Sequence, residues 1–415
     1  MVSFLGFPSR PKGRIVAMQA VIVSFDSLAA TSLGCFGNEW IETPNWDRLA
    51  ATGAVFDNHF VDTVSSLAGL AWATGRPAMR ANDASPSPCL GALLRANGIR
   101  SRLIAAGAVQ DWQRHFQFDG MQHVDGREGF DAKPDQTPFA EVVKQAITER
   151  ADGEDAHAHE LLWLHAPGPG APPEGFDALY FEDFDERGQQ TAELTDAERA
   201  CHPAVYAGSV SLMDHWLGEL LKHLDEQASS EPMLVIVMAA KGAIWKPVRA
   251  SRANASQSLA EVLGDQVART PLVLRVQRDP RFGDLICVRS DRLVQTCDLI
   301  PTLLDWFQVP QDPSSIQLAG QSWLREVLDE VPPREDLAYG DGADLVAVRT
   351  PEWLCISQRH VGQQGDEQGN ESVAEGASSR VALYVKPEDL WDINDISSQQ
   401  SEVVAELLTR LGRPS

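Results

Sequence analysis

Short apolar runs alternate along this chain with longer amphipathic stretches. The clearest apolar runs cover residues 21–25, 161–164, 234–238 and 272–276. Each run is almost continuously hydrophobic, which is typical of strands covered on both faces, as in a parallel sheet between layers of helices. The pattern therefore predicts an α/β protein with a doubly wound, mostly parallel sheet.

The amphipathic stretches predict helices between these strands. They cover residues 45–51, 90–97, 139–150 and 204–226. The first follows Thr43-Pro44, a favourable helix start, and the second ends at Gly98, a common helix C-cap. In a sheet of this kind ligands bind at the carboxyl ends of the strands. Asp26 directly follows the first apolar run, so we expect it at that edge.

The C-terminal part has a different pattern. We expect an N-terminal extension, a main α/β domain and a smaller C-terminal α+β subdomain, over residues 1–19, 20–310 and 311–415. Within the subdomain a stretch rich in Gln, Gly, Glu and Ser, residues 361–379, separates two strand-like runs. We interpret it as a long insertion in a hairpin. The amphipathic tail over residues 401–411 predicts a final helix.

Composition narrows the classes of partner. The chain has 415 residues, of which 43% are hydrophobic and 23% charged, as in an ordinary globular protein. Its formal net charge of -24 argues against nucleic acid, because binding to the phosphate backbone needs clustered Lys and Arg. No apolar run reaches the length of a membrane helix, so no membrane partner is expected.

The N-terminus and the cysteines bear on the compartment. Three basic residues (Arg10, Lys12 and Arg14) precede an apolar stretch, as in a signal peptide. That stretch runs straight into Asp26, however, so cleavage within it would remove the first core strand. The 6 cysteines lack metal-binding spacing and suit free thiols. We therefore expect a cytoplasmic protein.

Several segments occur in an order typical of one family. The first comprises the run ending in Asp26, the turn Ser32-Leu-Gly-Cys-Phe-Gly37 and the stretch Thr43-Pro-Asn-Trp-Asp-Arg-Leu49. The others cover residues 206–221, 270–275, 298–304, 347–350 and 390–394. Together these segments resemble the sulfatase family of the alkaline phosphatase superfamily. The resemblance starts near residue 20 and implies an alkaline-phosphatase-like fold.

The resemblance also implies a divalent cation held by two pairs of oxygen ligands, and here most of those ligands are replaced. Asp26 and Ser27 stand at the first pair, and Ala240 and Lys241 at the second. A protonated lysine binds no metal, and a lone carboxylate is far from the six or more oxygens that calcium prefers. We therefore expect no cofactor, or calcium or magnesium if the site is active.

The positions that the resemblance assigns to catalysis have changed too. Ser65 stands at the nucleophile position, where the family carries a formylglycine made from Cys or Ser. The proline and the arginine of that motif are Leu67 and Gly69, so we expect Ser65 to stay unmodified. An ordinary interpretation is that Ser65 caps a helix. Gly170 stands where the family has a substrate-binding histidine.

Other polar residues suggest two further arrangements. His59, Asp62 and His165 follow or end apolar runs, and they could join Asp26 in a remodelled site. Alternatively, they are hydrogen-bonded polar groups at strand ends. We also expect the strand ends carrying Asp26 and Lys241 to be neighbours, and we hypothesise that the lysine ammonium replaces the metal and pairs with Asp26.

Three functions remain open from the sequence. The first is a pseudoenzyme of the sulfatase type that binds a ligand or a partner. The second is an active hydrolase of sulfate or phosphate esters that uses Ser65 and an unconventional cation site. The third is an interaction protein in which the fold is only a scaffold. The expected partners are an anionic small molecule or a protein, and Lys246 and Arg249 could contribute to binding an anion.

Overall fold

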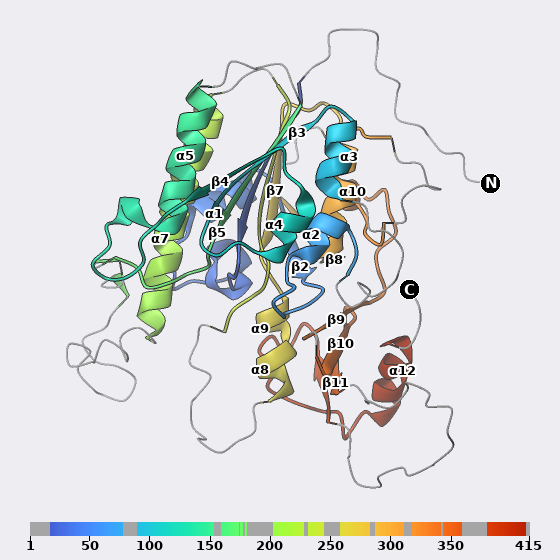
Figure 1. Ribbon diagram of the computed structural model, residues 1–415. Helices are drawn as coiled ribbons and strands as arrows, with labels where there is room; N and C mark the ends of the chain where they lie inside the picture. Colours follow the sequence, from blue (N-terminus) through green and yellow to red (C-terminus); the bar gives the residue numbers. More distant parts are fainter. Residues whose placement is uncertain are drawn as a thin grey trace, which may run out of the picture.

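The chain forms two sheets of different size and direction. The computed structural model describes residues 17–77, 89–152, 159–173, 175–176, 179–180, 202–227, 231–244, 258–282, 287–310, 318–341, 343–358 and 380–411. The large sheet has the strand order β4-β3-β5-β1-β6-β7-β2-β8, and the small sheet has the order β12-β11-β10-β9 (Figure 1). All pairs in the small sheet are antiparallel.

The large sheet contains all four predicted strands. Its strands are β1 (Gln19–Phe25), β2 (Ala54–Phe60), β3 (Arg100–Ala106), β4 (Gly120–Val124), β5 (Glu160–Ala166), β6 (Met233–Ala239), β7 (Leu272–Gln277) and β8 (Val288–Gln295). Every neighbouring pair is parallel except the two that involve β7. A continuous hydrophobic run reports burial on both faces and carries no information on strand direction, which explains why β7 looked like the others.

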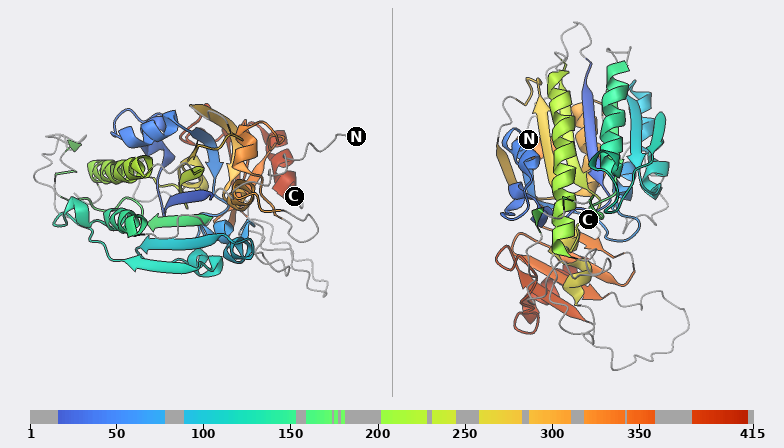
Figure 2. Two further views of the ribbon diagram at one scale, coloured as in Figure 1. Left: turned by 90° about the horizontal axis from the view of Figure 1, so that it is seen from above. Right: turned by 90° about the vertical axis from the view of Figure 1, so that its left-hand side faces the viewer.

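Helices cover both faces of the large sheet. The described helices are α1 (Pro44–Ala51), α2 (Leu70–Thr74), α3 (Leu90–Ala96), α4 (Asp111–Phe116), α5 (Pro138–Asp152), α7 (Pro203–Glu226), α8 (Leu259–Leu263), α9 (Asp265–Ala268), α10 (Leu299–Trp306), α11 (Trp323–Val327) and α12 (Ser401–Leu411), of which α8 and α12 pack against the small sheet instead. Val21 and Val23 pack into the core that α1, α5 and α7 share. Ala20 and Ile22 point to the opposite face, which α2, α3, α4 and α10 cover (Figure 2). The doubly wound architecture is thus confirmed.

A contact between α1 and α7 joins two of the family-like segments. The Asp214 carboxylate on α7 accepts hydrogen bonds from the backbone N–H groups of Asn45 (3.0 Å) and Trp46 (2.9 Å). It therefore supplies the cap that the residue before α1 lacks. At Gly218 an added Cβ would lie 2.5 Å from the Asn45 side chain, so only glycine lets the two helices approach this closely.

The small sheet lies against the large domain and shares a core with it. Its strands are β9 (Leu337–Gly340), β10 (Leu345–Arg349), β11 (Trp353–Gln358) and β12 (Val381–Val385). Phe60 and Val61, at the end of β2, pack with Leu263 and Tyr339 in one cluster. On the other side of the small sheet, α12 buries Leu407. The two strands that flank residues 361–379 do pair with each other, whereas the insertion itself lies outside the described residues.

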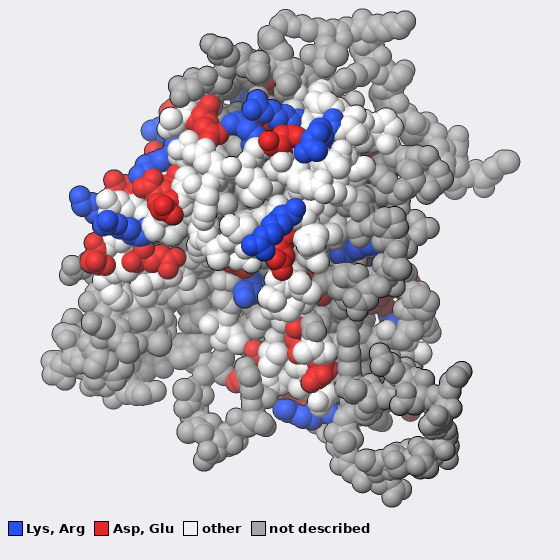
Figure 3. All heavy atoms as spheres, in the orientation of Figure 1, with Lys and Arg blue, Asp and Glu red and all other residues white. Residues whose placement is uncertain are grey.

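The surface carries mixed charge. On the face shown in Figure 3, Lys and Arg side chains lie among Asp and Glu side chains, with no continuous basic patch among the described atoms. This distribution accords with the formal net charge of -24. Among the described helices, none combines the length and the apolar character needed to cross a membrane.

Candidate functional site at the carboxyl edge of the large sheet

The ends of β1 and β6 lie side by side. Phe25 and Ala239 are register partners, and the Ala240 N–H donates to the Phe25 carbonyl at 2.8 Å. The Leu28 N–H then donates to the Lys241 carbonyl at 3.0 Å. The expectation that Asp26 and Lys241 follow neighbouring strand ends is confirmed. The residues that stand at both family ligand pairs therefore meet at one place.

A buried chain of hydrogen bonds leads to Asp26. The Trp163 indole Nε1 donates to Ser24 Oγ at 2.7 Å, and Ser24 Oγ lies 2.8 Å from His165 Nδ1. His165 Nε2 in turn lies 3.1 Å from Asp26 Oδ1. We call these four residues the Asp26 relay. Ser24 and His165 are register partners on β1 and β5, so the parallel pairing itself brings them together.

With a neutral His165 ring, one arrangement of protons satisfies every donor of the relay. The indole N–H can only donate, so Ser24 Oγ accepts its hydrogen bond. The Ser24 O–H can in turn donate a hydrogen bond to His165 Nδ1. A neutral imidazole that accepts at Nδ1 carries its proton at Nε2, where it faces the Asp26 carboxylate. In this arrangement every donor meets an acceptor. Ser24 is fully buried and serves as an internal link rather than a nucleophile.

The second oxygen of Asp26 faces outward. Its Oδ2 accepts a hydrogen bond of 3.4 Å from the side chain of Gln110, the residue before α4, and the Asp26 side chain is 31% exposed. The Trp112 ring packs edge-on against His165, with ring centroids 5.1 Å apart. Gln110, Ser24 and Trp163 were not singled out in the sequence. A serine within an otherwise apolar strand was the available signal for Ser24.

Lys241 does not pair with Asp26, so that hypothesis is wrong. Among the described residues, the charged or hydrogen-bonding partners of the Asp26 carboxylate are His165 and Gln110. The Lys241 side chain is partly exposed, and none of the described ion pairs includes it. His165 lies on β5 at the position that pairs with Ser24 of β1, and this register places its ring beside the Asp26 carboxylate.

Ser65 lies in a turn between β2 and α2. Its Oγ accepts hydrogen bonds from the Thr63 hydroxyl (2.9 Å) and from the Leu67 N–H (3.2 Å). It caps this turn and not α2, whose N-cap is Gly69. No histidine or carboxylate among the described residues hydrogen-bonds to the Ser65 hydroxyl. It therefore lacks the neighbouring base that normally activates a serine nucleophile.

Gly69, at the position of the family arginine, has a backbone that suits only glycine. Its φ is +86°, and an added Cβ would lie 3.0 Å from Trp112 and 3.1 Å from Trp72. The two indole rings pack edge-on, with centroids 5.3 Å apart, and Trp112 also packs on Trp163. Tryptophans thus fill the space beside this turn, and a long cationic side chain there would need both a strained backbone and a rearranged core.

The other polar candidates lie outside the Asp26 relay. His59 is fully buried, and its Nδ1 lies 2.7 Å from the Thr270 hydroxyl. Burial lowers the pKa of His59 to about 4. Asp62 accepts a 2.8 Å hydrogen bond from the Thr296 hydroxyl. Of the three candidates only His165 joins Asp26. Lys246 and Arg249 lie outside the described residues.

The residues present do not fit a divalent cation of the family type. Both Asp26 oxygens already accept hydrogen bonds from protein donors, so a cation would have to displace them. Ala240 offers no side-chain oxygen, and Lys241 adds a positive charge. Among the described residues, no group of three or more His, Cys, Asp or Glu side chains is arranged to hold a metal ion.

Comparison with solved structures supports the same fold. A phosphonate monoester hydrolase of Agrobacterium radiobacter superposes with a TM-score of 0.68 at 15% identity, covering 95% of this chain and 94% of that one. A 2-O GAG sulfatase gives 0.66 at 16%, covering 95% and 91%. A structure in complex with its substrate D-glucosamine-2-N,6-O-disulfate gives 0.64 at 15%, covering 96% and 97%. The comparison with curated protein sequences returned no match.

The fold and the residues at the carboxyl edge of the large sheet together define an alkaline-phosphatase-like α/β protein. The family described as Sulfatase matches residues 19–309, well over half of the chain. The chain therefore belongs to the sulfatase family. At identities this low the solved structures establish the fold, and each activity named above belongs to the protein that carries it.

Proposed function

We propose that this member of the sulfatase family is a pseudoenzyme, which has lost metal-dependent ester hydrolysis and acts by binding a ligand or a partner. The observation that carries the proposal is the state of Asp26. The one acidic residue at the four ligand positions has both oxygens hydrogen-bonded within the protein, to His165 and Gln110. The positions around it, Ser27, Ala240 and Lys241, cannot complete a cation shell.

The nucleophile position supports the same conclusion. Hydrolysis through Ser65 would need a base or a metal to remove its proton, because a free serine hydroxyl is a weak nucleophile. Its hydrogen-bond partners among the described residues, Thr63 and the Leu67 backbone, supply neither. Hydrolysis through Ser65 would therefore need a substrate that itself supplies the activating group.

The test combines activity with metal content. The full chain is assayed with an aryl sulfate and an aryl phosphate, with and without added calcium or magnesium, and the purified protein is analysed for bound metals. We expect no turnover above the Ser65→Ala variant and no stoichiometric metal. Metal-dependent turnover that disappears in both Asp26→Asn and Ser65→Ala would overturn the proposal in favour of the altered hydrolase.

A ligand at this edge is tested separately. If the partly exposed Lys241 holds an anionic small molecule, sulfate or phosphate should raise the melting temperature of the wild type more than that of Lys241→Met. Chloride at the same ionic strength is the control for screening of surface charge. Equal shifts in both proteins would exclude Lys241 as the anion-binding group and leave a protein partner as the ligand to seek.

A further inference from the structure

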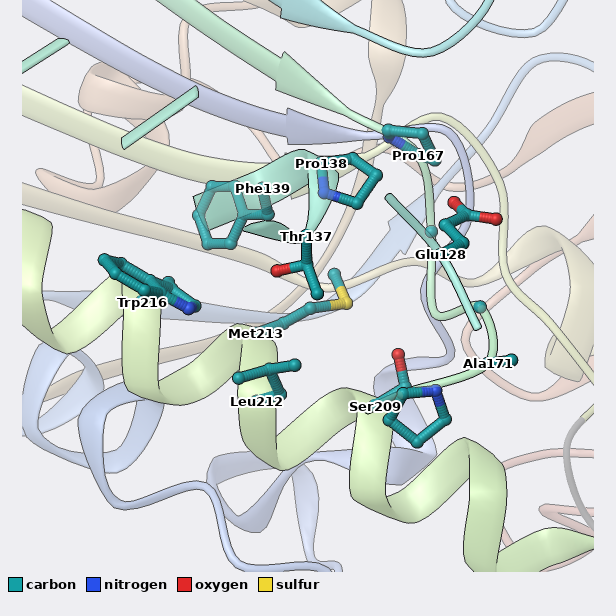
Figure 4. Close-up of a pocket in the computed structure, with 13 residues that line it drawn as sticks. Glu128, Thr137, Pro138, Phe139, Pro167, Ala171, Ser209, Leu212, Met213 and Trp216 are labelled. Atoms are coloured by element: carbon teal, nitrogen blue, oxygen red, sulfur yellow. The ribbon is translucent and has the colours of Figure 1, made fainter. Parts of the chain in front are cut away.

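A pocket opens on the other side of the large sheet from the Asp26 relay. It lies between the start of α5, the middle of α7 and the segment that follows β5 (Figure 4). The centres of water-sized molecules can occupy about 30 Å³ of it, and all the space up to and including its open mouth amounts to about 400 Å³. Its walls are mainly apolar, with Phe139, Met213 and Trp216 among them. None of its lining residues belongs to the Asp26 relay.

Four polar side chains of this pocket are described, of which two are hydrogen-bonded and two have no partner among the described residues. The hydrogen-bonded pair are Trp216 Nε1 and the Thr137 hydroxyl, which both donate to the Pro134 carbonyl, at 2.9 Å and 3.2 Å. The Ser209 hydroxyl and the Glu128 carboxylate have no such bond within the described chain. Ser209 is 7% exposed, whereas Glu128 is exposed at the surface. In Figure 4 both side chains border the same open space as Met213.

The Glu128 carboxylate lies directly beside the backbone of Gly170. A Cβ added to Gly170 would lie 3.2 Å from Glu128 Cδ and 3.3 Å from its Oε2. A Cβ at position 170 would therefore require the Glu128 carboxylate to move by a few tenths of an ångström, and a side chain as large as histidine would compete with it for the same space. The exchange of the family histidine for glycine thus does more than remove a group, because it admits an acidic side chain beside the pocket.

The charge and shape of the pocket select the chemistry of its occupant. Among the described residues no Lys, Arg or His lines it, and the whole chain carries a net charge of -24, so an anion is disfavoured and a cation is favoured. An unpaired carboxylate and a hydroxyl can accept the hydrogen bonds of an ammonium group. Aromatic and thioether walls suit the methylene chain that such a group carries.

We propose that this pocket binds a primary alkylammonium group, with Glu128 and Ser209 receiving the charged end and Phe139, Met213 and Trp216 contacting the chain. Two sources share this chemistry: a free alkylamine and a lysine side chain of another protein. The proposal does not rest on the loss of ester hydrolysis at Asp26, because the pocket shares no residue with the Asp26 relay, although its Gly170 stands at the family position of a substrate-binding histidine.

The test uses the full chain and a matched pair of probes. Binding of n-butylammonium and of n-butanol is measured by calorimetry and by the ε-methyl NMR signal of Met213, one of only 7 methionines. We expect saturable binding of the ammonium that shifts this signal and is at least about tenfold tighter than that of the alcohol. Nα-acetyllysine methylamide is the second probe: tighter binding than n-butylammonium identifies a lysine side chain as the source, and weaker binding a free amine.

Variants decide whether the named residues are responsible. Glu128→Gln and Gly170→His should each weaken ammonium binding by about tenfold or more. Asp125→Asn, which makes the same charge change at an exposed position of the same loop, and Asp26→Asn should leave it unchanged. Equal affinity for the alcohol, unchanged binding in Glu128→Gln, or no saturation by about 50 mM would each overturn the proposal. Ester hydrolysis by the wild type would leave it intact.

Discussion

At the scale of single residues, the chemistry of Ser65 follows from its neighbours. The motif that directs formylglycine formation in this family has lost its proline and its arginine, which are Leu67 and Gly69 here. Gly69 has a φ of +86° and lies against Trp112, so the backbone at the arginine position also disfavours a larger side chain. We expect Ser65 to remain an unmodified serine. Mass spectrometry of the peptide that contains it, together with hydrazide labelling, checks this, and an aldehyde at Ser65 would contradict the pseudoenzyme proposal.

His59 provides a residue-scale prediction about pH. Burial lowers its pKa from 6.5 in the unfolded chain to about 4 in the fold, so the unfolded state binds more protons between these values. Stability is therefore retained above about pH 6.5 and lost as the pH falls toward 4. Between about pH 7 and about pH 4.5, the wild type should lose about 2–3 kcal/mol more than His59→Asn.

The comparison of slopes isolates His59 from other groups. Asp392, whose pKa burial raises to about 6, acts in the opposite direction over the same range, but it does so in both proteins. His115→Asn, at an exposed histidine on α4, is the control for the substitution itself. Urea unfolding at each pH gives the free energies. Parallel curves for wild type and His59→Asn would mean that His59 is protonated in the folded state.

At the scale of elements, the ends of β1 and β5 are tied together by the Asp26 relay, in which Lys241 takes no part. Replacing His165 with Phe leaves the Ser24 hydroxyl without its acceptor and Asp26 Oδ1 without its donor. The stranded Ser24 hydroxyl is buried and costs about 1–3 kcal/mol, whereas Asp26, whose side chain is 31% exposed, can bind water instead. Lys241→Met removes no described ion pair and should change stability by less than about 0.5 kcal/mol.

Chemical denaturation of these two variants distinguishes the two descriptions of the site. A strong loss of stability in Lys241→Met, with little change in His165→Phe, would restore the hypothesis that the lysine ammonium replaces the metal. The relay also gives Asp26 a structural role although the other ligand positions carry no acidic residue. Its carboxylate is the terminal acceptor of a buried chain of donors, which is a role that needs no cation.

At the scale of the whole molecule, a buried ion network joins the small sheet to the large domain. Lys386 Nζ, whose side chain is 1% exposed, lies 2.5 Å from Asp392 Oδ1 and 3.2 Å from Asp265 Oδ2 on α9. Asp392 Oδ2 also accepts a 2.8 Å hydrogen bond from the Asp265 N–H. The network therefore fixes α9, which connects β6 to β7 of the large sheet, against the loop after β12.

Removing the cation of this network should destabilise the entire chain. Lys386→Met strands the buried Asp392 carboxylate and leaves Asp265 with Arg349, whose Nε lies 3.5 Å from Asp265 Oδ2. Loss of one partner of a buried ion pair typically costs about 3–5 kcal/mol. Lys144→Met, which breaks a pair with Glu141 whose side chains are 40% and 30% exposed, should cost less than about 1 kcal/mol. Because Phe60 and Tyr339 share one core, we expect calorimetry to show a single transition that moves as a whole. Two transitions, of which only one shifts, would show that the small sheet unfolds independently.

Much of the architecture could be predicted because it depends on local patterns. The predicted helix over residues 401–411 has the bounds of α12, and the four apolar runs are β1, β5, β6 and β7. The direction of β7 could not be predicted, because the same hydrophobic run suits a buried strand of either direction. The boundary of the small subdomain at residue 311 and the cytoplasmic location remain predictions.

For the site, residue identity and residue contact have separate origins. The sequence by itself determined which groups stand at the family positions, namely Asp26, Ser27, Ser65, Ala240 and Lys241, because chemical identity is a property of each residue. Only the tertiary structure decided that His165 and not Lys241 meets Asp26, since the register of β1 with β5 sets that contact. It also decided that Gly170 admits Glu128 beside a pocket, because such proximity depends on how distant segments pack.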